Sequence, residues 1–175
     1  MKQTDKQYKA YLAILHEELV PAMGCTEPIA VAYAAAKAAA VLGCQPDRVK
    51  IAASDNIIKN VKSVVVPNTG GLRGIAAAAA AGIAAGDADK TLEVISRVDA
   101  VGQKKIAAFL ESTEITVCKI DSSLIFDLAV TVYYRCASAK VQISHFHTNI
   151  VLIKKNEGIV YQNQDCEEIK SSVLT

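Results

Sequence analysis

The feature that most constrains the fold is a change in the period of the apolar residues near Glu114. In most of the chain before Glu114 they recur every three or four positions, the spacing of helices that pack on a core. After it they alternate, as in a half-buried strand. Helices early and antiparallel strands late predict an α+β domain, with N-terminal helices packed on a mainly antiparallel β-sheet.

Four helical regions are predicted before that change. The first covers residues 8–20, and the second begins with Thr26 as its N-cap and ends near Leu42, before a left-handed Gly43. An alanine-rich helix over 72–85 ends at Gly86, and a helical region follows from a capping Asp89 to about Ser112, broken near Gly102.

The predicted strands are short. Apolar and other residues alternate over 49–53, and residues 61–66 form a β-branched run. Two strands are therefore expected, one on each side of residues 54–60. A later strand has an apolar face of six residues, and the strand after it has a face that includes two histidines. The first face is Leu124, Phe126, Leu128, Val130, Val132 and Tyr134, and the second is Val141, Ile143, His145 and His147. A hairpin turn is predicted at Asn156-Glu157-Gly158.

Composition excludes several classes of protein. The chain has 175 residues, the size of one domain, and 51% of them are hydrophobic. With 19 basic and 18 acidic residues and no basic run, nucleic acid is not an expected partner. The apolar stretches 28–44 and 72–85 are too short and too weakly apolar to span a membrane. The N-terminus lacks a signal sequence, and five widely spaced cysteines fit reduced thiols, so a cytoplasmic protein is expected.

The sequence Gly24-Cys25-Thr26-Glu27-Pro28 is the sharpest local motif. A cysteine just before a helix has its thiolate favoured by unpaired N–H groups and the helix dipole, which predicts a lowered pKa for the Cys25 thiol. Such a thiolate can be a base, a nucleophile or a metal ligand. The alternative is a small buried side chain beside an ordinary helix start.

A second motif is the turn Asn68-Thr69-Gly70-Gly71, between the predicted strand and the alanine-rich helix. Backbone N–H groups in such a turn can bind a carboxylate or a phosphate. The turn can equally be a simple connection between two elements. No Gly-Lys-Ser/Thr follows, so a P-loop is excluded.

Two further groups of polar residues are candidates for binding. His145 and His147 on one strand face could hold a metal or orient an acid, or could be hydrogen-bonded residues on a wet sheet face. Lys59 and Asn60 offer a cation and an amide to an amino-acid carboxylate, although a solvated lysine is also common. The other cysteines, Cys44, Cys118, Cys136 and Cys166, have no metal-ligand spacing and are expected to be structural.

Taken in order, these motifs resemble the N-terminal part of the L-cysteine desulfidase family, relatives of the iron–sulfur L-serine dehydratase alpha chain. The residues that carry the resemblance are 19–30, Lys59-Asn60-Val61, 66–71 and His147-Thr148-Asn149-Ile150. The resemblance implies a lyase that removes the β-substituent of a small amino acid at a [4Fe–4S] cluster, without pyridoxal phosphate.

The resemblance also implies roles for individual residues. Cys25 would be the base or a cluster ligand, and His147 would be catalytic and hold the substrate or the leaving group together with Thr148 and Asn149. Substrate binding would involve Lys59, Asn60, Asn68, Thr69, Gly70 and Gly71.

Family members are longer, and the C-terminal region that anchors their cluster is missing here. Residues 1–175 are therefore expected to be a single domain, the N-terminal part of a longer enzyme, with no cluster in this chain alone. A homo-oligomer is also expected, because removing the C-terminal half would leave an apolar surface. L-cysteine is the expected substrate. An L-serine dehydratase domain and a non-catalytic amino-acid-binding module are the alternatives.

Overall fold

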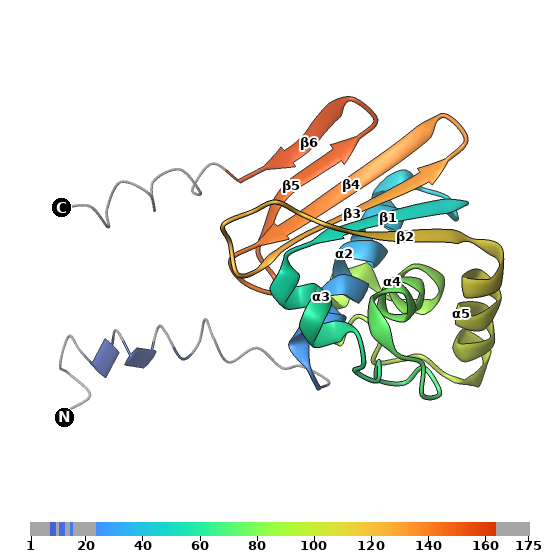
Figure 1. The fold of residues 1–175 in the computed structure, drawn as a ribbon, viewed down its shortest axis with the longest axis horizontal. Coiled ribbons are helices and arrows are strands. Elements are labelled where there is room, and N and C mark those ends of the chain that lie inside the picture. The colour runs from blue at the N-terminus through green and yellow to red at the C-terminus, as the bar shows by residue number, and fades with distance from the viewer. Residues whose placement is uncertain (1–7, 10, 13–14, 16–23, 164–175) are drawn as a thin grey trace.

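The computed structural model describes residues 8–9, 11–12, 15 and 24–163, and its strands form a single sheet with helices on one side (Figure 1). The helix predicted over 8–20 therefore lies mostly outside the described residues. The helices are α2 (Thr26–Leu42), α3 (Asp55–Val61), α4 (Gly74–Ala85), the 3-10 helix η1 (Ala88–Glu93) and α5 (Ala100–Ser112). The strands are β1 (Arg48–Ala53), β2 (Glu114–Lys119), β3 (Asp127–Tyr134), β4 (Ala137–Ser144), β5 (Ile150–Lys155) and β6 (Gly158–Gln162).

The six strands have the order β2-β1-β3-β4-β5-β6. Among the described strands, only β1 and β2 pair in parallel, because the chain between them crosses over through α3, α4, η1 and α5. Every other pair is antiparallel. The predicted α+β fold, with helices packed on a mainly antiparallel sheet, is confirmed.

Helix α2 is the centre of the core. Its residues from Pro28 to Ala36 are buried, and it packs on α4 and on strands β3 and β4. Alanines and glycines let the two helices approach closely: a Cβ built on Gly82 would lie 2.0 Å from the Ala32 carbonyl oxygen. Gly43 adopts the predicted left-handed conformation (φ 85°) and ends α2.

The strand predicted over 61–66 is wrong. Residues 55–61 instead form α3, and its Ile57 and Val61, four positions apart, are both buried on one helical face. The valines that follow make only an isolated bridge, between Val65 and Arg73. Only Val61 of the run joins the helix, and the β preference of the remaining valines yields no more than this bridge to residues 72–74.

The helical region after Asp89 is broken elsewhere than predicted. Gly102 lies inside α5, and the interruption comes before it, where Asp99 caps the helix by accepting a hydrogen bond from the Gly102 amide at 2.8 Å. A Cβ on Gly102 would come within 3.3 Å of Val98 and Ala85. This glycine therefore permits close packing and does not break the helix.

The predicted hairpin is confirmed. The hairpin at Asn156-Glu157-Gly158 joins β5 to β6, with Asn156 in a left-handed conformation (φ 53°). Within the described ranges, no helix combines the length and the apolar character needed to cross a bilayer.

Candidate functional site

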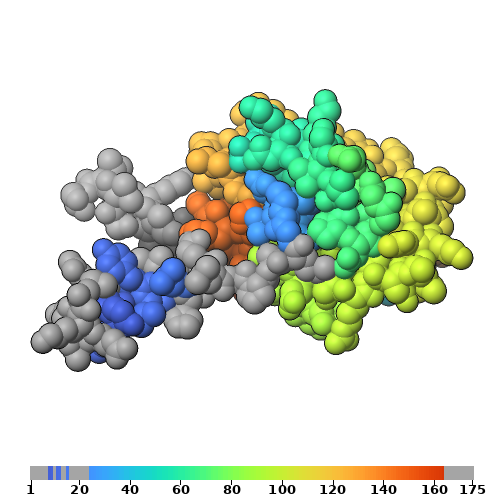
Figure 2. Space-filling model, turned by 90° about the horizontal axis from the view of Figure 1, so that it is seen from below, coloured from blue at the N-terminus to red at the C-terminus, as the bar shows by residue number. Residues whose placement is uncertain are grey.

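Most of the predicted site residues gather around the N-terminal end of α2. Cys25 is the N-cap residue, one position before the predicted cap, and it is exposed. Figure 2 shows the start of α2, in light blue, reaching the surface between the green segment that includes α3 and the orange segment of the last strands. Three parts of the chain that are distant in sequence therefore meet here.

A chain of hydrogen bonds joins Cys25 to α3. The Cys25 thiol donates to one carboxylate oxygen of Glu27, with an Sγ–O distance of 3.2 Å. The side-chain amide of Asn60 donates to the other oxygen at 2.9 Å. A thiol, a carboxylate that can take its proton and an amide that fixes this carboxylate form the general arrangement of an activated nucleophile or base.

The surroundings keep the Cys25 thiol protonated. Partial burial, the hydrogen bond to the Glu27 carboxylate and the negative charge of that carboxylate raise the pKa of Cys25 above its ordinary value, against a smaller lowering by the Glu27 backbone. The predicted lowered pKa is therefore wrong. Burial of the thiol is the largest cause, and the hydrogen bond to the Glu27 carboxylate adds to it, so together they outweigh the lowering of the pKa expected at a helix start.

This environment predicts slow alkylation of Cys25. Only the thiolate reacts, and a raised pKa moves thiolate formation to higher pH, so at pH 8 we expect Cys25 to react with iodoacetamide at least about threefold more slowly than exposed Cys136. Mass spectrometry of the labelled peptides measures both rates in one sample. Glu27→Gln removes the charge and should speed the labelling of Cys25, while Cys136 serves as the internal control. If Cys25 reacted fastest in the unaltered protein, the assigned environment would be wrong.

His147 lies on the other side of Cys25. Its Nε2 atom is 3.2 Å from the Thr26 hydroxyl oxygen, and its ring lies 4.5 Å from the ring of Phe126, centroid to centroid. Thr26 is thus the first residue of α2 and bonds to His147, rather than being the predicted cap. This contact places an imidazole next to the thiol-bearing residue.

The two histidines do not lie on a strand as predicted. Strand β4 ends at Ser144, and the chain turns at His145, which has a φ of 71°. The shared strand face of His145 and His147 is therefore wrong. The reason is local hydrogen bonding that ends the strand: the Asn149 side-chain amide donates to the Ser144 carbonyl at 2.9 Å.

A buried carboxylate supports this turn from below. The Asp127 carboxylate is buried and accepts hydrogen bonds from the Gln142 amide and the Ser144 hydroxyl, each at 2.9 Å. The backbone of Phe126 also accepts a hydrogen bond from the His145 amide at 3.0 Å. The position of His147 is therefore fixed by the sheet.

The predicted glycine turn is built into the fold and lies against the cysteine motif. The buried Thr69 hydroxyl donates to the Val66 carbonyl at 2.7 Å, and the Asn68 side-chain amide donates to the Ile95 carbonyl at 3.1 Å. A Cβ on Gly24 would lie 3.6 Å from the Pro67 ring, so the turn begins beside Cys25.

The remaining predicted residues lie in the glycine turn, in α3 and after β4. Gly70 and Gly71 are exposed and adopt left-handed conformations, with φ values of 75° and 96°. Lys59 is exposed in the last turn of α3, where a cation is favoured by the helix dipole. Thr148 and Asn149 line one end of a groove of about 320 Å³.

Sequence reasoning missed two residues. Both belong to the cysteine motif, where the sequence pattern identifies Thr26 only as a helix cap and gives Glu27 no role of its own. The spacing of Glu27, two residues after Cys25 at a helix start, is the signal that could have identified it. The contact of Thr26 with His147 joins residues 121 positions apart and has no local signal.

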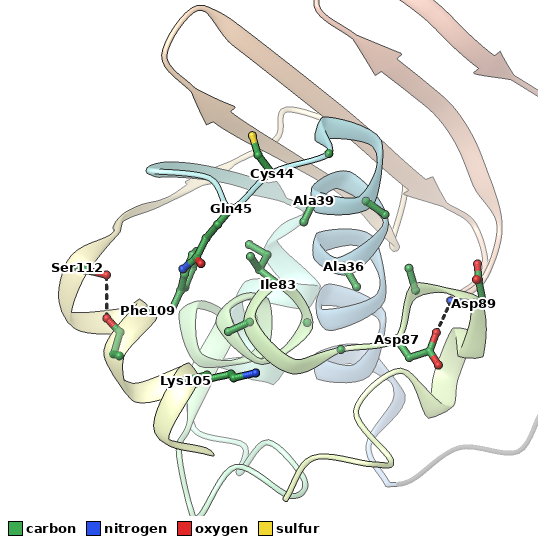
Figure 3. A pocket seen from close by; sticks show the side chains of 17 residues that line it. Ala36, Ala39, Cys44, Gln45, Ile83, Asp87, Asp89, Lys105, Phe109 and Ser112 are labelled. Atoms are coloured by element: carbon green, nitrogen blue, oxygen red, sulfur yellow. Dashed lines mark hydrogen bonds between the residues drawn. The ribbon is translucent and has the colours of Figure 1, made fainter. Parts of the chain in front are cut away.

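A larger hollow lies at the opposite end of α2. This cleft of about 930 Å³ is formed mainly by small residues of α2, α4 and α5, with polar groups such as Gln45, Asp87 and Lys105 at its rim (Figure 3). Since α2 has 17 residues, its two ends lie about 25 Å apart. The cleft therefore contributes nothing to the cluster at Cys25.

The cysteine cluster does not fit an iron–sulfur centre. Among residues 24–163, no group of three histidine, cysteine or acidic side chains is arranged to hold a metal ion. The Cys25 thiol donates its hydrogen bond to the Glu27 carboxylate. The described residues thus offer no ligand set for a cluster on Cys25.

Several relatives of this chain are named UPF0597 proteins. The chain is 51% identical over 173 residues to a UPF0597 protein of Desulfitobacterium hafniense, a match that covers 99% of this chain and 40% of the relative. It is 40% identical over 175 residues to a UPF0597 protein of Treponema denticola, covering 100% of this chain and 41% of the relative. It is also 40% identical over 172 residues to a UPF0597 protein of Lachnoclostridium phytofermentans, covering 96% and 41%. No protein-family model matches the chain, and no solved structure does.

These similarities correct the family expected from the motifs. The relatives are UPF0597 proteins, and none of these three is named a cysteine desulfidase. The resemblance to that family is therefore wrong. Nothing in these similarities supports what depended on it, namely the lyase activity, the iron–sulfur chemistry and the role in cysteine catabolism. The chain spans about two fifths of the length of the curated relatives it matches, as expected of part of a longer protein, and what it resembles over nearly all its length is a UPF0597 protein.

Proposed function

We propose that the cluster around Cys25 is part of an enzyme active site that moves the Cα proton of a small amino acid. The observation that carries this proposal is the exposed Cys25 thiol, hydrogen-bonded to a carboxylate that Asn60 holds in place. Glu27 takes the thiol proton, and the resulting thiolate removes the proton from Cα. The proton then returns from the thiol or is exchanged with solvent.

The neighbouring groups support an amino acid as the substrate class. The turn that begins at Pro67 lies against Gly24, and its exposed glycines give a carboxylate access to the backbone. On the other side of Cys25, the His147 imidazole contacts Thr26, the residue that follows Cys25 in the sequence. The thiol is thus placed between a turn suited to a carboxylate and an imidazole suited to a polar side chain, which favours L-serine or L-cysteine.

Solvent exchange at Cα tests the proposal. We expect the full-length Desulfitobacterium relative to replace the Cα proton of L-serine with deuterium in D₂O, measured by proton NMR. A serine at the position aligned with Cys25 should slow exchange by about 100-fold or more, the usual contribution of a positioned base. A serine aligned with Cys136 is the matched control and should leave the rate unchanged. No exchange by the unaltered protein, or full exchange by the first variant, would reject the proposal.

A second candidate is a non-catalytic module that binds a small amino acid. The raised pKa of Cys25 favours it, because a thiol that stays protonated can serve as a hydrogen-bond donor without reacting. This candidate predicts calorimetric binding of L-serine by the 175-residue chain, unchanged by Cys25→Ala. If binding persists in that variant and exchange is absent, the module replaces the enzyme.

We also propose the cytoplasm as the compartment of this protein. Cys25, Cys44, Cys118 and Cys136 are all free thiols, and free thiols persist in a reducing environment.

A further inference from the structure

Strand β6 is the exposed edge of the sheet. All five of its residues are exposed, among them Ile159 at 56% and Val160 at 60%. No described strand pairs with its outer edge, since β6 ends the strand order next to β5. Its outer backbone groups are thus available to another strand.

The two edges of the sheet differ in a way that points to a partner. Strand β2, at the other edge, begins with Glu114 and ends with Lys119, which forms an ion pair with Asp55. Charged residues of this kind protect an edge strand from pairing. Strand β6 has the sequence Gly-Ile-Val-Tyr-Gln and carries no charge. Of the two edges formed by residues 24–163, only the β6 edge lacks this protection.

A groove continues this surface toward the candidate site. It is lined by Thr148, Asn149, Ile150, Ile153 and Tyr161. Ile153 pairs with Tyr161 on β6 and with the buried Val141 on β4, so the groove is on the helix-covered face of the sheet. Helix α2 packs mainly on β3 and β4, and β5 and β6 extend beyond it (Figure 1). The groove is therefore the part of that face that α2 leaves open.

We propose that the rest of the longer protein docks on β6, adding an extended apolar segment to its free edge and covering the groove beside it. The UPF0597 relatives have about three fifths of their length outside the part that this chain matches, which is ample length to supply such a segment. Because covalently linked parts meet at a high effective concentration, a short added strand is enough to hold them together. The docked segment ends next to Thr148, beside His147. The proposal does not depend on the chemistry of Cys25.

Hydrogen exchange of intact proteins tests the docking. In the full-length Desulfitobacterium relative, the amides aligned with β6 should exchange at least about tenfold more slowly than those of β6 in the 175-residue chain. The amides aligned with β2 are the matched control and should exchange equally in both. Equal exchange at β6 would overturn the proposal. Protection of β6 in the 175-residue chain that rises with its concentration would also overturn it, and would identify a second copy as the occupant.

Lysine substitutions test the edge itself. In the 175-residue chain, Val160→Lys and Val117→Lys should leave the Tm unchanged, because both valines are exposed, at 60% and 39%. In the full-length relative, lysine aligned with Val160 should lower the Tm by about 3 °C or more, while lysine aligned with Val117 should not. Equal effects of the two lysines in the full-length relative would overturn the docking at β6.

Discussion

Gly82→Ala should destabilise the protein by about 3 kcal/mol or more, the upper range for inserting a methyl group into a packed core. The added Cβ would lie 2.0 Å from the Ala32 carbonyl oxygen and 2.9 Å from its Cα, so a backbone has to move. Gly82 lies where α4 contacts α2. Moving the two helices apart would also disturb the packing of α2 on the sheet. Urea unfolding followed by circular dichroism measures the loss.

Gly158→Ala is the matched control for Gly82→Ala. Its added Cβ would make an ordinary contact, 3.5 Å from the Lys155 carbonyl oxygen. We expect a change within about 0.5 kcal/mol, typical of surface positions. If the two alanine variants had the same stability, the close approach of α2 and α4 would be incorrect.

Asp127→Ala should cost about 2 kcal/mol, because it leaves two donors without their charged acceptor. Both the Gln142 amide and the buried Ser144 hydroxyl donate to this carboxylate. Ser144 also holds the turn that carries His147, through its carbonyl contact with Asn149. We therefore expect the amides of residues 145–149 to exchange faster in the variant, which NMR can follow residue by residue.

Asp121→Ala provides the comparison for the buried aspartate. Asp121 is exposed in the loop between β2 and β3, and its loss should leave both stability and exchange of 145–149 unchanged. An Asp127 variant with unchanged exchange in the turn would show that the carboxylate does not hold His147.

The sequence pattern predicts the layers of this fold because they depend on local periodicity. The alternation in β3 places Leu128, Val130 and Val132 in the core, and Gly43 ends α2 where a left-handed residue is needed. The run 61–66 misleads because its β-branched residues have an intrinsic strand preference, whereas Val61 is buried as part of a helical face. Packing against distant elements, and not intrinsic preference, determines the secondary structure of that segment.

In the candidate site, too, local features follow from the sequence pattern and long-range contacts do not. The cysteine motif and the glycine turn are recognisable as local patterns, and the structure brings Gly24 against Pro67. The helix dipole alone predicts the wrong direction for the pKa of Cys25, because partial burial of the thiol and its hydrogen bond to the Glu27 carboxylate raise that pKa. The contact between Thr26 and His147 depends on how β4 ends, which periodicity does not describe.

The central position of α2 has a consequence for synthesis on the ribosome. Leu42, at the end of α2, is synthesised about a hundred residues before Ser144, at the end of β4. At roughly 10 residues per second, α2 is therefore complete about 10 s before the strands on which it packs. A leucine-rich helix exposed for that time would invite aggregation. The alanines that let α2 approach α4 so closely also make the waiting helix a weak target for neighbouring nascent chains, because each exposes little apolar surface.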